Sequence, residues 1–383
     1  MKRYIETLLI LIIVSLGTAF AAELNQILEL KDAARSWVAY NGYPEYYTSA
    51  KSLYRVDNHS VKVMNNYNPS SHINISPNGQ YRLFSVLQEL DEVKDDQRFS
   101  DYYVNDENDK RLYTVNRGTD ADLKPYVAAI SDRGVLALAD PVRAMVYFYE
   151  KGDMTAEGQL YEDDGDMSME RNILMQWVGD QCFIMLERPG FNGGPAGKSL
   201  FIRINADGRE QITTALPFSY LQKFVFKNNR FFISGYNYSA KTQQMLPLIV
   251  EVSDAGTVIW NNENFGHELV MSLNGEYLAA LSSHEQIQLF DLKHQRVEQI
   301  NFDHENMACL GLTVNNNGEI AVIRVSLDFF AKRNTHFAQI YFPRSKELAT
   351  IQLDPRFSKL FQLHTDGNRF FVGSNYEWLE IAK

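Results

Sequence analysis

Short apolar runs separated by tight polar turns recur along most of this chain. In one copy, apolar residues 73–75 lead into Ser76-Pro77-Asn78-Gly79, and a second apolar run covers residues 81–84. Asn-Gly and Asp-Gly pairs adopt positive φ at little steric cost, and tight hairpin turns require that conformation. The pattern therefore predicts β-hairpins, and few stretches of the chain show helical spacing.

Seven copies of this hairpin follow one another at similar intervals. Their turns are centred on residues 79, 134, 179, 229, 275, 318 and 367, which are 43 to 55 residues apart. A second hairpin follows the first, as where residues 248–252 turn at Asp254-Ala255-Gly256 and return through residues 258–260. The first strands are almost continuously apolar, as expected of strands covered on both faces, and the later ones alternate more clearly. Each copy therefore predicts one four-stranded antiparallel sheet, which needs about this length of chain.

A closed ring is the arrangement that such repeated sheets favour. The repeat over residues 55–383 resembles the β-propeller superfamily of WD40-like, YVTN-like and quinoprotein-like proteins, and the resemblance is one of architecture. We predict an all-β, seven-bladed β-propeller of four-stranded antiparallel blades, with six to eight blades compatible with the pattern. The run at residues 60–64 has no other partner, so we expect it to pair with residues 376–382 and remove the exposed sheet edges. A pair of two-sheet sandwiches is the alternative.

The first 21 residues have the features of a bacterial-type signal peptide. Lys2 and Arg3 precede an apolar run over residues 8–20, and Ala19-Phe20-Ala21 places small residues where a signal peptidase reads them. The run is too short to span a bilayer, which needs about 20 apolar residues. We therefore predict cleavage between Ala21 and Ala22, a periplasmic or extracellular location, and no transmembrane segment in the mature chain.

Residues 22–54 lie outside the predicted ring. Leu24, Ile27, Leu28, Ala34 and Val38 fall near helical spacing. A short amphipathic helix that packs on the ring is one interpretation of this segment. A leader with little order is the other.

The charge and the cysteines narrow the range of partners and cross-links. The formal net charge of -11 disfavours general binding to the phosphate backbone of nucleic acids. Cys182 and Cys309 belong to units on different sides of the expected ring, and a disulfide needs Cα atoms within about 7 Å. We therefore expect two buried, unpaired thiols, and we expect a monomer.

No linear motif in the chain indicates a catalytic centre. The sequence contains no His-x-x-x-His pair, no Cys-x-x-Cys pair and no Gly-x-Ser-x-Gly elbow, so we assign no catalytic residue and no cofactor. The acidic run at residues 162–170 offers oxygen ligands that suit Ca²⁺, although its spacing differs from that of an EF-hand. Its weak candidate ligands are Asp163, Asp164, Asp166 and Glu170. A solvated acidic loop is the interpretation that we favour.

The longest loops are expected on one face of the ring, because they join second to third strands or one blade to the next. Exposed aromatic residues and arginines carry much of the energy of protein interfaces. The predicted partner-binding residues in or beside these loops are Tyr102, Tyr103, Phe191, Asn192, Tyr236, Tyr238, Phe329, Phe330, Lys332 and Arg333. We therefore predict a non-enzymatic scaffold that binds a protein or peptide through this loop-rich face. The alternative is a propeller enzyme, or a binder of small ligands or metals, that uses the mouth of the central channel.

Overall fold

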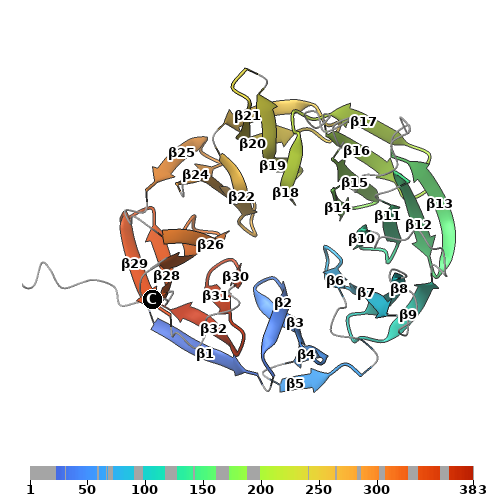
Figure 1. The fold of residues 1–383 in the computed structure, drawn as a ribbon, viewed down its shortest axis with the longest axis horizontal. Coiled ribbons are helices and arrows are strands. Elements are labelled where there is room, and N and C mark those ends of the chain that lie inside the picture. The colour runs from blue at the N-terminus through green and yellow to red at the C-terminus, as the bar shows by residue number, and fades with distance from the viewer. Residues whose placement is uncertain are drawn as a thin grey trace, which may run out of the picture.

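The computed structural model is a ring of eight four-stranded antiparallel sheets arranged around a central axis (Figure 1). It describes residues 23–382 except for 31, 58–59, 66, 68–71, 90–97, 117–126, 141–142, 161–171, 188–198, 240, 264, 283–285, 302–306, 327–334 and 354–361. Each sheet is one blade, and the first strand of each blade lies nearest the axis (Figure 1). This arrangement is a β-propeller.

The first four blades follow one another along the chain. Blade 1 contains β2 (Ala34–Tyr40), β3 (Tyr43–Ser49), β4 (Leu53–Asp57) and β5 (Ser60–Val63). Blade 2 contains β6 (His72–Ile75), β7 (Tyr81–Glu89), β8 (Arg98–Asp106) and β9 (Arg111–Asn116). Blade 3 contains β10 (Val127–Ile130), β11 (Leu136–Asp140), β12 (Met145–Glu150) and β13 (Asp153–Gln159). Blade 4 contains β14 (Ile173–Val178), β15 (Gln181–Leu186), β16 (Leu200–Asn205) and β17 (Gln211–Ala215).

The remaining blades complete the circle. Blade 5 contains β18 (Tyr220–Lys227), β19 (Arg230–Ser239), β20 (Gln244–Val252) and β21 (Val258–Glu263). Blade 6 contains β22 (Phe265–Met271), β23 (Tyr277–Ser282), β24 (Ile287–Asp291) and β25 (Arg296–Ile300). Blade 7 contains β26 (Met307–Val314), β27 (Ile320–Ser326), β28 (Thr335–Phe342) and β29 (Glu347–Gln352). Blade 8 contains β30 (Gln362–Thr365), β31 (Phe370–Gly373), β32 (Glu377–Ala382) and, from the other end of the chain, β1 (Glu23–Glu29).

The prediction of seven blades is wrong, because residues 34–63 form a complete additional blade. Its first turn, Asn41-Gly42, has φ values of 48° and 83° and carries the same signal as the seven turns that we recognised. The two strands beside it are rich in aromatic and β-branched residues, which favour a strand over the expected helix or unordered leader. The described residues of the segment 22–54 are therefore part of the ring.

The ring is closed by a different strand from the one that we predicted. β1 pairs with β32 in a register that places Glu23 opposite Ala382 and Leu28 opposite Trp378. Residues 60–63 instead form the outer strand of blade 1, where Ser60 lies opposite Asp57. The two ends of the chain thus share blade 8, and β1 covers the edge of β32 that would otherwise be bare.

The seven predicted turns all join the first and second strands of a blade, as the repeat requires. The glycines at six of them, Gly79, Gly134, Gly179, Gly275, Gly318 and Gly367, have positive φ, and Asn229 has φ 59° at the seventh. Several turns are hydrogen-bonded to the turn of the next blade. Asn78 N donates to Asp132 Oδ1 at 2.7 Å, and Asn274 N donates to Asn316 Oδ1 at 2.8 Å. These bonds hold neighbouring blades together on one face of the ring.

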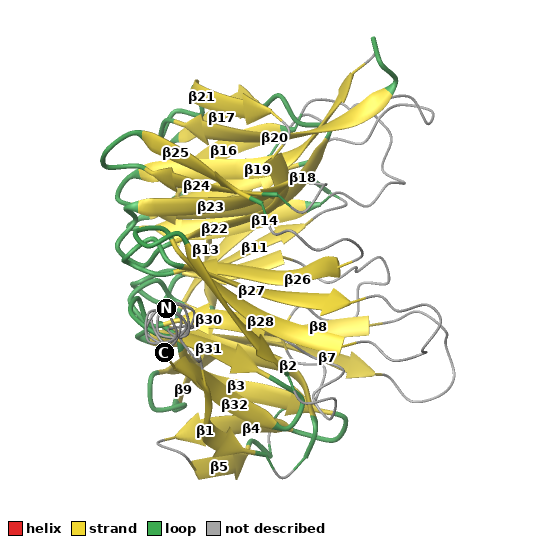
Figure 2. Cartoon of the chain, turned by 90° about the vertical axis from the view of Figure 1, so that its left-hand side faces the viewer, coloured by secondary structure: helices red, strands yellow, loops and turns green. Residues whose placement is uncertain are grey.

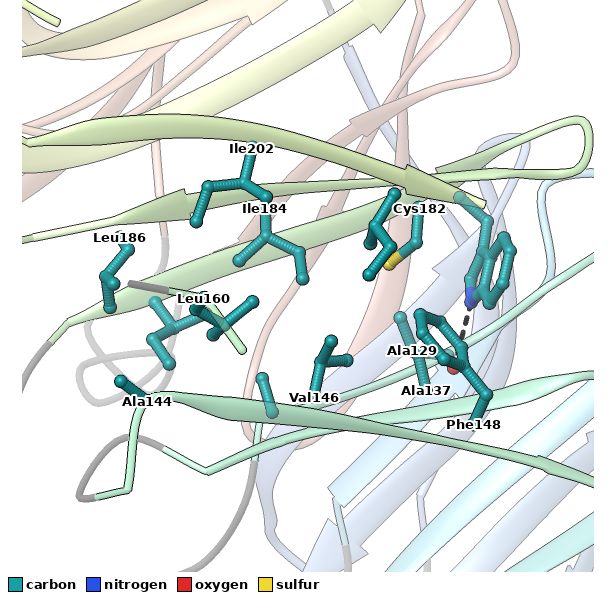
Figure 3. Close-up of a cluster of buried hydrophobic side chains, with 14 of the residues drawn as sticks. Ala129, Ala137, Ala144, Val146, Phe148, Leu160, Cys182, Ile184, Leu186 and Ile202 are labelled. Atoms are coloured by element: carbon teal, nitrogen blue, oxygen red, sulfur yellow. Dashed lines mark hydrogen bonds between the residues drawn. The ribbon is translucent and has the colours of Figure 1, made fainter. Parts of the chain in front are cut away.

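The hydrophobic core lies between neighbouring blades. Figure 3 shows one such cluster, in which Val146 and Phe148 of blade 3 face Cys182 and Ile184 of blade 4. Trp177 Nε1 donates a hydrogen bond to Ala129 O at 3.2 Å across this interface. Because each blade buries its faces only against its neighbours, the ring is stable as a whole.

Neither cysteine forms a disulfide, as predicted. Cys182 is buried, and Cys309 is half-buried where we expected full burial. Among the described residues, no helix has the length and apolar character needed to cross a membrane. The predicted signal peptide, residues 1–21, and its cleavage point lie outside the described residues.

Candidate protein-binding surface

The two faces of the ring differ, and the loop face carries a projecting hairpin (Figure 2). β19 and β20 extend beyond the neighbouring strands there. The pairing of β19 with β18 ends where Tyr220 lies opposite Tyr236. Pairing with β21 likewise reaches only Leu248, which lies opposite Glu263. Residues 237–239 and 244–246 therefore pair only with each other, and we call residues 236–247 the blade 5 hairpin.

One side of the blade 5 hairpin is aromatic and apolar. Side chains alternate along a strand, so Tyr236 and Tyr238 share a side, and Met245 lies opposite Tyr238 on that same side. Tyr220 of β18 lies opposite Tyr236 and extends the row. Tyr220 is 46% exposed and Met245 is 37% exposed. Leu246, on the reverse side, is also 37% exposed, so both sides present apolar surface to solvent.

The base of the hairpin is held against blade 6. Tyr236 Oη lies 3.0 Å from His267 Nδ1 on β22. Lys223 Nζ forms an ion pair with Glu268 Oε1 next to it. Burial raises the pKa of the Tyr236 phenol, so its hydroxyl keeps its proton at neutral pH.

Close backbone approach makes this contact possible. A Cβ added at Gly266 would lie 2.8 Å from both Leu248 N and Leu248 O, and 2.9 Å from Gly235 O. Only glycine leaves room for β22 to pass so near the strands of blade 5. The base of the hairpin is therefore fixed in direction by backbone packing and by the bond from Tyr236.

Of the residues predicted from sequence, Tyr236 and Tyr238 lie on this surface. Tyr102 does not, because its side chain is 0% exposed in the cluster between blades 2 and 3. Tyr103, the next residue, points to the other side of β8 and contacts Arg111. Neighbouring residues in a strand face opposite ways, so Tyr102 is a core residue and its assignment to a binding surface is corrected.

The other predicted residues fall outside the part of the chain that the structure describes. These are Phe191, Asn192, Phe329, Phe330, Lys332 and Arg333, together with the weak calcium candidates Asp163, Asp164, Asp166 and Glu170. Sequence reasoning missed Tyr220, Met245 and Leu246. Alternation across residues 236–246 around a polar turn was the signal that could have found the last two.

Within the described residues, no group of three or more His, Cys, Asp or Glu side chains is arranged to hold a metal ion. The described part of the candidate surface consists of aromatic, apolar and hydrogen-bonding side chains. Such a set can bind a surface of complementary shape, with tyrosines supplying both apolar contact and hydrogen bonds.

Solved structures confirm the architecture of the ring. The structure of BamB from Moraxella catarrhalis is 9% identical in sequence, with a TM-score of 0.54 over 94% of this chain and 100% of that one. The C-terminal WD40 domain of Sif2 is 12% identical, with a TM-score of 0.58 over 95% of this chain and 99% of that one. No protein-family model matches the sequence, and no curated protein matches it. The chain is thus similar to these proteins in fold, and that fold is a β-propeller.

Proposed function

We propose that this protein is an exported, non-enzymatic scaffold that binds a protein or peptide partner through its loop face. The observation that carries the proposal is the blade 5 hairpin, which presents Met245 and Leu246 to solvent beside the exposed Tyr220 and the half-buried Tyr238, from a base fixed by Tyr236. Aromatic side chains bury a large area on binding and lose little conformational entropy when they are already held in place. Binding surfaces of this kind are typical of interaction scaffolds.

The predicted partner-binding residues of other loops belong to the same proposal. Phe329 and Phe330 fall between β27 and β28 in the sequence, and we expect a connection of this class to contribute to the loop face. We expect the double substitution of these two residues by alanine to abolish partner capture and to leave the melting temperature nearly unchanged. A large fall in melting temperature would identify them as core residues instead.

Site-specific photo-crosslinking tests the surface while the partner is still unidentified. A photoreactive phenylalanine analogue is placed at position 238 or 245, and the protein is irradiated in the cells that produce it. We expect one discrete adduct from these positions, and none from the matched exposed positions Met154 and Val297 on the outer strands. The same adducts from all four positions, or none from the hairpin, would contradict the proposed surface.

Export is tested separately, because it depends on residues 1–21. The positive start, the apolar run and the Ala-Phe-Ala ending support cleavage before Ala22. We expect the mature protein, recovered from the periplasmic or medium fraction, to begin at Ala22 by mass spectrometry. A full-length chain retained in the cytoplasm would contradict export and would leave the hairpin experiment unaffected.

A further inference from the structure

A groove separates the outer strands of blades 1 and 2. Its volume is about 780 Å³, and its lining comes from β4, β5 and β9 and from the segments next to them. Three basic side chains, Arg55, Lys62 and Arg111, line it together with the carboxylates of Asp57 and Asp109. The groove lies on the rim of the ring, and none of its lining residues belongs to the blade 5 hairpin.

Arg111 is held in a fixed position between two tyrosines. Its guanidinium carbon lies 3.7 Å from the ring centroid of Tyr103 and 5.6 Å from that of Tyr67. Arg111 Nη2 donates to Tyr67 Oη at 3.2 Å. Tyr103 Oη in turn donates to Asp101 Oδ2 at 3.1 Å, which fixes the ring on which the guanidinium stacks. A stacked guanidinium keeps its planar fork of donors ready for a bidentate acceptor.

The charges in the groove are not balanced by its own acids. Arg55 forms an ion pair with Asp109 and also donates to Glu107 O at 3.0 Å. Among the residues that the structure describes, neither Arg111 nor Lys62 has a carboxylate within salt-bridge distance. Lys62 also lies directly opposite Arg55 in the sheet, and like charges in that position are unfavourable.

We propose that this groove is a binding site for an oxyanion, either a carboxylate or a phosphate group. Arg111 would supply a bidentate contact and Lys62 a second positive charge from the facing strand. Arg55 is already paired with Asp109, so the anion would supply the counter-charge that Lys62 and Arg111 lack. The whole chain has a net charge of -11, whereas Arg111 and Lys62 make this groove locally positive. This site does not depend on the proposed protein-binding surface.

Anion titration of the whole protein tests the site. Inorganic phosphate and succinate are added separately, at ionic strength held constant with sodium chloride, and binding is followed by calorimetry and by the melting temperature. We expect saturable binding and a rise in melting temperature with at least one anion. The anion that binds more tightly tells which group the site prefers. No saturable binding of either would overturn the proposal.

Substitutions locate the binding. Arg111→Ala and Lys62→Ala should each weaken it by about tenfold or more, since each removes a charged contact. Arg111→Lys keeps the charge without the planar fork, so it should weaken binding of the bidentate acceptor too. Arg133→Ala is the matched control, because Arg133 is exposed, pairs with Asp180 and does not line the groove. Unchanged affinity in Arg111→Ala, with circular dichroism showing a folded protein, would refute the site.

Discussion

At the scale of single residues, three glycines at the first turn of a blade are covered by a tyrosine of the preceding blade. Tyr40 lies over Gly79, Tyr81 over Gly134 and Tyr277 over Gly318. In each case an added Cβ would come within 3 Å of the tyrosine ring, so the positive φ and the close packing both require glycine. The turn chemistry that identified the repeat thus also builds the contact between blades.

Alanine substitution separates these two requirements. Gly318 has φ 77° and a tyrosine atom 2.7 Å from the added Cβ, whereas Gly179 has φ 57° and nothing within 4 Å. We expect Gly179→Ala to cost about 1 kcal/mol of unfolding free energy from backbone strain alone. Gly318→Ala should cost a further ~1–3 kcal/mol because the ring must move. Denaturant unfolding measures the unfolding free energy of both variants. Equal losses in the two would show that the Tyr277 ring moves aside without cost.

His364 on β30 makes stability depend on pH. Its Nε2 is buried without a hydrogen-bond partner among the described residues, and its ring lies 4.9 Å from that of Trp378. Burial lowers the pKa of His364 from 6.5 to about 4. The unfolded chain therefore binds a proton at a pH where the folded chain does not, so this residue destabilises the fold as the pH falls from 6.5 towards 4.

Substitution of His364 by phenylalanine should remove that dependence. We expect the wild-type protein to lose about 3 kcal/mol of stability between pH 7 and pH 4 through this group. The change of unfolding free energy with pH over this range should be smaller in His364→Phe. His72→Gln serves as the control, because the side chain of His72 is exposed. Urea unfolding at several pH values makes the comparison. Parallel profiles for wild type and His364→Phe would contradict the assignment.

At the scale of elements, β1 is the strand on which ring closure depends. Its Leu28 is 5% exposed and packs in a cluster with Trp37, Tyr47 and Trp378. That cluster joins blade 8 to blade 1. Blade 8 combines three strands from the C-terminal end of the chain with β1 from the N-terminal end. The seam also holds Tyr47 Oη and Trp378 Nε1, which are buried without a partner among the described residues. Because unpaired buried groups lower stability, the remaining contacts of β1 matter more.

Removal of residues 22–29 from the mature chain should open the seam. The loss of buried leucine surface alone amounts to about 3 kcal/mol, and the bare edge of β32 should promote self-association. Chemical unfolding and light scattering measure the two effects. Gln26→Ala in the full chain is the control, because Gln26 is exposed on the same strand. A truncated protein with wild-type stability and no self-association would show that blade 8 holds with three strands.

At the scale of the whole molecule, the ring has no unique starting point. Glu23 and Ala382 are opposite each other on paired strands, so the two ends of the propeller are adjacent (Figure 1). The same blade would form if those ends were joined by a short turn and the chain were cut elsewhere. Adjacent termini are the condition under which permuted chains fold.

A permuted chain tests this equivalence. Ala382 is linked to Glu23 by a short glycine-rich turn, and the chain is opened between Lys151 and Gly152, at the turn from β12 to β13. The new N-terminal strand, β13, should then complete blade 3 as β1 now completes blade 8. We expect the same circular dichroism spectrum and a melting temperature within about 5 °C of wild type. An unfolded or oligomeric product would mean that the natural closure at blade 8 is required.

Local chemistry in the sequence determined the four-stranded blade and its turns, because Asn-Gly and Asp-Gly turns and apolar strands act over a few residues. The same signal was present at Asn41-Gly42, but helical spacing of Leu24, Ile27 and Leu28 led to another interpretation. The closing strand was decided by tertiary structure alone, since β1 and β32 come from opposite ends of the chain. Packing likewise decided that Tyr102 is core and that Tyr103 holds Arg111, because a strand buries one side and exposes the other.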